Sequence, residues 1–259
     1  MLRISSWTLA IILAAVLLSG PAGAQQNANG SQGENQGQAM AVVKRMADFL
    51  SGAERFSVNA DIGFDVVQDN GQKVEFGETR KMLISRPGRL RIEETKRDGS
   101  VSELVFDGET LMLNYPGDNV YAVVERPGTV DDAVSYFVDD LGMRLPLAEM
   151  LSSKLAESLA AKTLSAAFVE KASIDGVPCD HVLLRGAEAD LQLWIAEGAE
   201  PLPQRVVITY YHLDGRPQFW ARFSDWNMSP KVPDKLFGIA LPDGAVKIEF
   251  AAQMIQPVQ

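Results

Sequence analysis

The sequence predicts an α+β fold built on one antiparallel sheet, and three features of its 259 residues indicate this. Residues 56–66 alternate strictly between apolar and polar side chains, which is typical of a long strand with one buried face. Tight-turn motifs such as Asp69-Asn70-Gly71 separate further segments of this kind, and links that short cannot carry a parallel crossover. Helical spacing of apolar residues is confined to residues 39–51 and to the interval 129–160.

The strand pattern amounts to about eleven or twelve strands. The expected strands are residues 56–66, 74–84, 90–95, 101–106, 110–115, 120–124, 166–174, 179–185, 191–195, 205–211, 218–226 and 246–250. They form two meanders, one on each side of the helical interval. Within that interval we expect one helix over residues 131–141, capped by Thr129 or Asp131, and a second that begins at Pro146.

The N-terminus has the pattern of a cleaved secretory signal. Arg3 precedes an apolar run over residues 9–18, and Ala22-Gly23-Ala24 fits the small-residue cleavage rule, so the mature chain should begin at Gln25. A single membrane anchor is the alternative, but the run is about half of the roughly 20 residues that a span requires. No later segment is apolar enough to cross a membrane. The polar residues 25–38 predict a flexible leader.

Composition limits the possible functions. The chain has 24 basic and 34 acidic residues, a net charge of −10, which argues against nucleic acid as a partner. It has one cysteine and two histidines, too few for a disulfide framework or a histidine-built metal site, so we expect no metal and no cofactor. An acidic, exported chain that is poor in cysteine is typical of the periplasm of a Gram-negative cell.

Catalytic patterns are weak. Cys179 and His181 share one face of a predicted strand while Asp180 points to the other, so Asp180 cannot orient His181. The nucleophile elbow, the zinc-protease helix motif and the phosphate-binding loops are missing from the sequence. Adjacent acidic pairs such as Glu93-Glu94 diverge rather than converge, and we interpret them as solvated surface. No catalytic residue is therefore predicted.

A long apolar face is the most informative pattern for function. It could be a filled core, or it could border a cavity for a hydrophobic ligand between the sheet and a lid formed by residues 129–160. The ligand-binding candidates on the strands are Phe56, Val58, Ile62, Phe64, Val66, Leu111, Leu113, Tyr121, Leu191 and Leu193, and those on the lid are Val134, Phe137, Leu141 and Leu151.

The order of elements and several local motifs resemble a family of uncharacterised predicted periplasmic proteins that has the fold of the lipoprotein carriers LolA and LolB. The motifs are Lys44-Arg45-Met46, Arg86-Pro87-Gly88-Arg89-Leu90-Arg91, Phe106-Asp107-Gly108, residues 175–181, Leu193-Trp194-Ile195, Pro201-Leu202-Pro203, residues 207–210 and Ser224-Asp225-Trp226. The resemblance implies a strongly curved sheet, like half a barrel, over residues 39–253, with helices on its concave face. Residues 254–259 would be a C-terminal tail.

The resemblance implies no established activity. The carriers hold the acyl chains of lipoproteins in their cavity, and sensors of envelope stress carry a similar domain. We therefore expect a periplasmic, non-catalytic protein that binds a lipid or a lipoprotein acyl chain under the helical lid. The alternatives are an interaction or sensor module whose concave face is permanently plugged and which meets another envelope protein, and an undetected hydrolase.

Overall fold

A computed structural model describes residues 24–141 and 145–250 of the chain. The predicted signal segment, except for its last residue Ala24, and the predicted tail lie outside the described residues. The chain divides at Glu34 into two units, residues 1–34 and 35–259. The described part of the first unit, residues 24–34, is helical.

Helix α1 (Ala24–Ser51) is longer than the sequence predicted. Residues 25–38 were expected to be a flexible leader, but the structure places them in this helix. Glutamine, glutamate and alanine are adequate helix formers, and a helix nucleated by its apolar C-terminal half adds further turns easily. Asn35 also contacts the sheet, because its side-chain amide exchanges two hydrogen bonds of 2.9 and 3.0 Å with the backbone of Phe168. The leader prediction is therefore wrong for residues 35–38.

Twelve strands form one sheet, as the sequence predicted. They are β1 (Arg55–Val67), β2 (Lys73–Ser85), β3 (Arg89–Lys96), β4 (Val101–Phe106), β5 (Thr110–Tyr115), β6 (Val120–Glu125), β7 (Ser165–Ile174), β8 (Val177–Arg185), β9 (Asp190–Ala196), β10 (Pro203–Thr209), β11 (Gln218–Asn227) and β12 (Val246–Lys247). Their order across the sheet is β12-β6-β5-β4-β3-β2-β1-β11-β10-β9-β8-β7.

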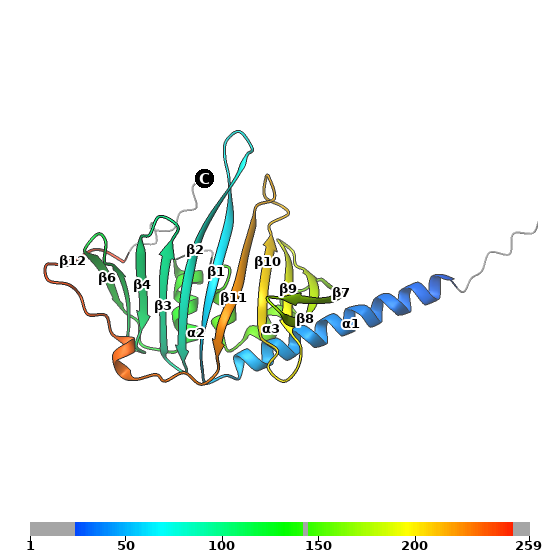
Figure 1. The fold of residues 1–259 in the computed structure, drawn as a ribbon, viewed down its shortest axis with the longest axis horizontal. Helices are drawn as coiled ribbons and strands as arrows, with labels where there is room; N and C mark the ends of the chain where they lie inside the picture. The colour runs from blue at the N-terminus through cyan, green and yellow to red at the C-terminus, as the bar shows by residue number, and fades with distance from the viewer. Residues whose placement is uncertain (1–23, 142–144, 251–259) are drawn as a thin grey trace, which may run out of the picture. The chain divides into compact units, whose positions relative to one another are not determined.

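The two meanders meet at β1 (Figure 1). Strand β1 pairs antiparallel with β2 on one side and with β11 on the other, so that Ile62 lies between Glu78 and Ala221. The last strand differs from the prediction over residues 246–250. Strand β12 has only two residues and runs parallel to β6, because the long connection over residues 228–245 carries the chain across the sheet before it pairs.

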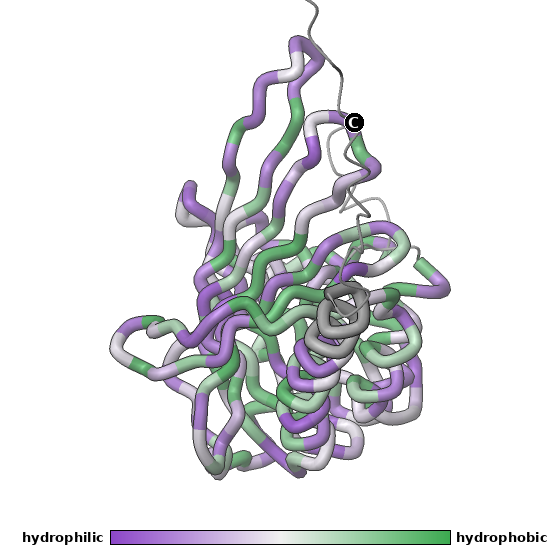
Figure 2. The backbone as a smooth tube through the Cα atoms, turned by 90° about the vertical axis from the view of Figure 1, so that its right-hand side faces the viewer, coloured by the Kyte–Doolittle hydropathy of each residue, from purple (hydrophilic) through white to green (hydrophobic). Residues whose placement is uncertain are grey.

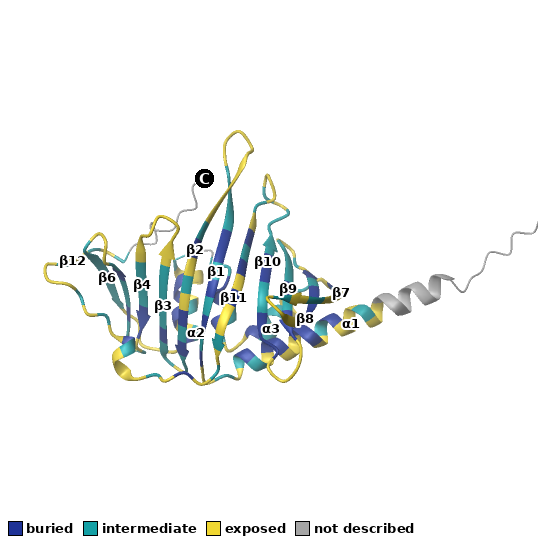
Figure 3. Cartoon of the chain, in the orientation of Figure 1, coloured by how far each residue is buried: buried dark blue, intermediate teal, exposed yellow. Residues whose placement is uncertain are grey.

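The sheet is open and strongly curved, and helices cover its concave face. Apolar residues of α1, of the helical interval and of the strands form one core cluster, to which Phe56, Ile62 and Leu193 belong. Figure 3 shows the buried lower part of β1 and β2 and the exposed tip of their hairpin. Figure 2 shows the same hairpin extending beyond the helical layer.

The helical interval is a series of short, irregular pieces, which we call the lid. It comprises α2 (Val130–Ser135), the π-helical turn η1 (Tyr136–Asp140), the 3-10 turn η2 (Ala148–Leu151) and α3 (Leu155–Lys162). The predicted helix over residues 131–141 is confirmed in its extent, but its second half is a π-helical turn and not α-helix. The wider π turn places Val138 at 38% exposure.

Gly63 of β1 must be a glycine because the indole ring of Trp220 on the neighbouring strand lies directly over it. Gly63 lies opposite Trp220 of β11, and a Cβ atom at Gly63 would lie 2.5 Å from the indole ring. The Trp220 indole also donates a hydrogen bond of 3.1 Å to Glu75. The ring therefore covers the glycine and joins β11 to the β1–β2 hairpin on the outer face of the sheet.

We predict that Gly63→Ala lowers the free energy of unfolding by about 1–3 kcal/mol, because the ring must move and lose its bond to Glu75. In a Trp220→Ala background the same change should be close to neutral. Chemical denaturation followed by circular dichroism measures both. Gly117→Ala is the control, because its Cβ would meet nothing within 4 Å. An equal cost in both backgrounds would contradict the explanation.

Candidate functional site

The candidate site is the concave apolar face under the lid, and the structure brings most of the predicted residues together there. Seven of them belong to the buried core: Phe56, Val58, Ile62, Leu111, Leu193, Phe137 and Leu151. Four are partly buried against that core: Phe64, Leu191, Val134 and Leu141. Val66 and Leu113 share the face by strand alternation and are half-buried.

Tyr121 is the one predicted site residue that lies elsewhere. It pairs with Asn114 of β5, which points to the outer face, whereas Leu113 pairs with Ala122 on the concave face. The sequence pattern could not decide this, because β6 is apolar at consecutive positions and either set could point inward. The strand register decides it.

The lid fills the face that it covers. Leu147, Met150 and Leu151 meet Phe56, Val58, Met82 and Trp226 around a cavity of about 10 Å³. That is about the smallest volume that holds one water molecule. A chain-like ligand can therefore enter this place only when the lid moves.

The apolar face continues past the lid as a strip along the β1–β2 hairpin, formed by Phe64, Val66, Val74 and Phe76. We call these four residues the hairpin strip. The Phe64 and Phe76 rings stack with centroids 6.1 Å apart, and Val74 and Phe76 are 42% and 50% exposed. Sequence analysis missed Val74 and Phe76 as site residues. Their cross-strand register with Phe64 and Val66 is the signal that identifies them.

A charged group interrupts the apolar face beside the strip. Glu78 and Arg80 of β2 and Glu94 of β3 point to the concave side, and the Arg80 guanidinium binds both carboxylates, with Glu94 at 3.1 Å. Burial raises the pKa of Glu78, and the charge of Arg80 offsets part of that effect. Glu94 was expected to be solvated surface, and this is wrong because Arg80 lies directly opposite it in the register.

Arg86, which follows β2, fastens the lid to α1. Its Nη1 donates to the carbonyl of Leu151 at 2.8 Å, and its Nε donates to the carbonyl of Ala53 at 3.1 Å. Burial lowers the pKa of the guanidinium, and the nearby Asp131 carboxylate counteracts this effect. One side chain thus satisfies a carbonyl of the lid and a carbonyl just after α1.

The lid is also held at the start of α2. Thr129 and Asp132 form a capping box, and the backbone N–H of Val130 donates to the carbonyl of Pro87 at 2.7 Å. Asp131 accepts hydrogen bonds from the hydroxyl and from the backbone N–H of Ser153, the latter at 2.8 Å. The lid is therefore tied by polar contacts along one rim.

The cysteine–histidine pair has the arrangement that the sequence predicted. Cys179 is fully buried on the outer face, and burial raises the pKa of its thiol. His181 stacks on Trp194 with ring centroids 4.1 Å apart. Asp180 points to the concave side and binds Lys171 at 2.6 Å and Arg45 of α1 at 3.4 Å. Asp180 therefore holds α1 and does not act on His181.

A second hollow, with a volume of about 520 Å³, lies where α1 ends and β1 begins. Its lining is mixed, with Phe49 and Met228 beside Asp48, Glu54 and Arg55. Across residues 24–141 and 145–250, no group of three or more potential metal ligands occurs. The described helices include none that is both long and apolar enough to cross a membrane.

We predict that Arg86→Ala loosens the lid, because two partly buried carbonyls lose their donor. The free energy of unfolding should fall by about 2–3 kcal/mol, in the range for hydrogen bonds to a charged group. Amides of residues 148–151 should exchange with solvent earlier than those of β1. Arg97→Ala, which removes an exposed ion pair with Asp61, is the control and should change stability by about 0.5 kcal/mol or less. Slow, unchanged exchange at residues 148–151 would contradict this role.

Acid should loosen the same rim. Burial raises the pKa of Asp131, but the hydrogen bonds from Ser153 outweigh burial and leave it below its usual value. A carboxylate with a lowered pKa stabilises the fold above its unfolded pKa of about 3.9 and loses that effect as the pH falls through the folded value. We expect amide exchange at residues 130–135, corrected for its intrinsic pH dependence, to accelerate below about pH 4. In Asp131→Asn this acceleration should be absent, and its persistence there would contradict the assignment.

Several solved structures are similar to this chain. The LolA superfamily protein NE2245 from Nitrosomonas europaea is 13% identical, with 78% of this chain and 97% of that chain covered and a TM-score of 0.41. The lipoprotein LppX from Mycobacterium tuberculosis is 13% identical, with coverages of 76% and 99% and a TM-score of 0.47. MucB of the MucA/MucB complex from Pseudomonas aeruginosa is 14% identical, with coverages of 78% and 61% and a TM-score of 0.43.

No curated protein matches the sequence. A family described as "Predicted periplasmic protein (DUF2092)" matches residues 39–251, which is most of the chain and includes the sheet, the lid and the segment after β11. The chain belongs to this family of predicted periplasmic proteins.

Proposed function

We propose that this periplasmic protein binds a hydrophobic ligand, an acyl chain of a lipid or of a lipoprotein, between the curved sheet and the lid. The ligand is held without chemical change. The observation that carries the proposal is the continuity of the apolar face along β1, beside the charged Glu78–Arg80–Glu94 group. The hairpin strip is exposed, and Phe64 of the strip packs directly against the core that the lid covers.

The length of this face suits a flexible hydrocarbon chain. A ligand that first contacts Phe76 and Val74 has apolar neighbours from the exposed strip to the covered residues Ile62 and Val58. Exposed apolar surface next to a covered apolar face is typical of a ligand-binding groove. The acyl chain of the ligand therefore keeps at least one side in contact with apolar residues along the whole path.

The short helices of the lid support the proposal that it can open. Its longest helix, α3, has eight residues, and α2 has six. Helices this short are not stable on their own, so the lid depends on its contacts with the sheet. Since Arg86 and the hydrogen bond from Val130 to Pro87 hold one rim, the lid can turn about that rim while Leu147 leaves the sheet.

A plugged concave face is the second candidate function, and the small cavity favours it. The 10 Å³ between the lid and β1–β2 is the packing expected of a permanent core. In that case the protein would act through another surface, as an interaction or sensor module that meets an envelope protein. The hydrolase alternative has weaker support, because the buried Glu78 is engaged by Arg80.

Two valines of matched exposure test the proposal. Val74 of the strip and Val101 of the outer face are 42% and 40% exposed. A dansyl-labelled fatty acid should gain fluorescence on binding the mature protein. We expect Val74→Asp to weaken its affinity at least about tenfold, because a charge would lie against the acyl chain, while Val101→Asp binds as the unchanged protein does. Equal affinity for both variants, or no binding by the unchanged protein, would refute the proposal.

A lid variant separates the two candidate functions. If the lid opens, Phe137→Ala should increase the fluorescence of the same probe and should cost about 3 kcal/mol or less, because ligand can fill the space. If the lid is a permanent plug, the same change removes core packing, costs about 3–5 kcal/mol, and leaves the probe unbound. Denaturation curves measured with and without the probe distinguish these outcomes.

A further inference from the structure

The segment after β11, residues 228–250, touches the outer face of the sheet, its edge and the lid in turn, and we call it the C-terminal strap. It runs from the lower end of β11 past β2 and β3 to the 3-10 turn η3 (Asp234–Phe237), and then on to β12 beside β6 (Figure 1). Its last described residue is Phe250, which packs against the core from the side of the lid.

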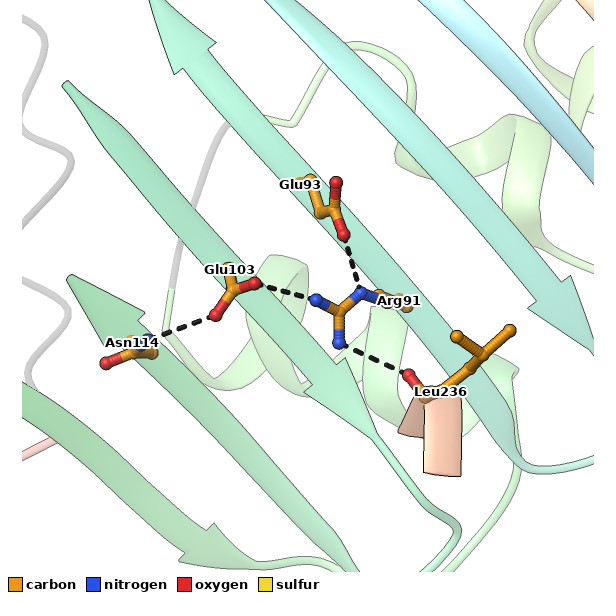
Figure 4. Close-up of polar contacts among 5 residues, drawn as sticks. All are labelled: Arg91, Glu93, Glu103, Asn114 and Leu236. Carbon is orange, nitrogen blue, oxygen red and sulfur yellow. Dashed lines mark hydrogen bonds and ion pairs between the residues drawn. The ribbon is translucent and has the colours of Figure 1, made fainter. Parts of the chain in front are cut away.

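The strap is anchored on the outer face by Arg91 of β3 (Figure 4). The Arg91 guanidinium donates to the carbonyl of Leu236 at 3.3 Å, to Glu103 at 2.7 Å and to Glu93 at 2.9 Å. Asn114 donates to the second oxygen of Glu103 at 3.0 Å. The arginine is thereby fixed in orientation, with one donor directed at the strap.

Two further contacts strengthen the anchor. Arg89 binds the carboxylate of Asp234 at 2.5 Å, and its guanidinium lies 5.6 Å from the ring centre of Phe237. Phe237 is only 4% exposed, yet it lies outside the main core cluster. Its ring is buried against the outer side of the sheet, so η3 is a docked element and not a free loop.

Beyond the anchor, the strap is held only lightly at the sheet edge. Strand β12 contributes Val246 and Lys247 to the sheet. Beside this pairing, the backbone N–H of Val246 donates to the carbonyl of Asn119 at 3.0 Å, and that of Ile248 donates to the carbonyl of Tyr121 at 2.8 Å. The Val246 side chain is 58% exposed. A two-residue pairing at a sheet edge can open without disturbing β6.

The strap ends on the lid. The Phe250 ring lies with its centroid 6.0 Å from both the Tyr136 and Phe137 rings, which are 5.8 Å from each other. Tyr136 and Phe137 begin the π-helical turn of the lid, and Arg126 lies 4.1 Å over the Tyr136 ring. A three-ring cluster thus joins the end of the strap to the turn of the lid that directly follows α2.

We propose that the C-terminal strap is a latch that regulates access to the acyl-chain site, a role that rests on the function proposed above. The lid opens only after Phe250 leaves Tyr136 and Phe137, and the outer-face anchor determines how often that happens. The anchor and the latch lie on opposite faces of the sheet and are joined through the edge strand β12. A partner that engages η3 on the outer face would therefore release the lid without touching it.

Hydrogen exchange of the mature protein tests the latch without any ligand. We expect Phe250→Ala to accelerate exchange at residues 130–141 about tenfold while residues 56–66 of β1 stay unchanged. Phe237→Ala should have the same effect from the opposite face. If Phe237→Ala proves too unstable, Arg89→Ala, at a half-buried site, tests the same anchor. Val246→Ala, on the strap but exposed, is the matched control and should exchange as the unchanged protein does.

The latch is overturned if Phe250→Ala leaves exchange of the lid unchanged, or if it accelerates the lid and β1 equally. Binding of the dansyl-labelled fatty acid to the same variants separates this result from the proposed function. Faster lid exchange with no probe binding by any variant would overturn the acyl-chain function and leave the latch standing. Probe binding with unchanged lid exchange in both strap variants would overturn the latch alone.

Discussion

The pairing of β1 with both β2 and β11 is the constraint on which the rest of the structure depends. It joins a meander from the first half of the chain to one from the second half, and it places Phe56, Val58 and Ile62 at the centre of a single sheet. Trp220 over Gly63 reinforces this junction from the outer face. Because one curved sheet results, its two open edges are far apart and its concave apolar face is long.

A long apolar face must be covered, and the chain covers it with two different elements. Helix α1 lies over the second meander and is held by the ion pair of Arg45 with the buried Asp180. The lid covers the first meander with short, irregular pieces tied at one rim. Neither element reaches the hairpin strip, so the sheet keeps an exposed continuation of its apolar face. The proposed ligand path exists because the apolar face of the sheet is longer than the part that α1 and the lid cover.

On the outer face of the sheet, charged side chains of β3 hold the C-terminal strap where it passes over this strand. Arg89 and Arg91 are consecutive outward positions of β3, and together they hold the strap through Asp234 and the carbonyl of Leu236. Their inward neighbours Leu90 and Ile92 pack against the core. Strand alternation thus makes one strand serve the core on one face and the C-terminal segment on the other. Through β3 and the strap, a change at the outer face is therefore connected to the lid.

The sequence alone determined the strands, the antiparallel hairpins and the inward positions of β1, because a period of two and tight-turn motifs act locally. It also separated Cys179 and His181 from Asp180, for the same reason. The pairing of β1 with β11, the inward position of Arg80 and the outward position of Tyr121 come from register between distant strands, which local patterns do not encode. The filling of the concave face and the contact of Phe250 with the lid were likewise decided by tertiary structure, since packing volume exists only once the elements have met.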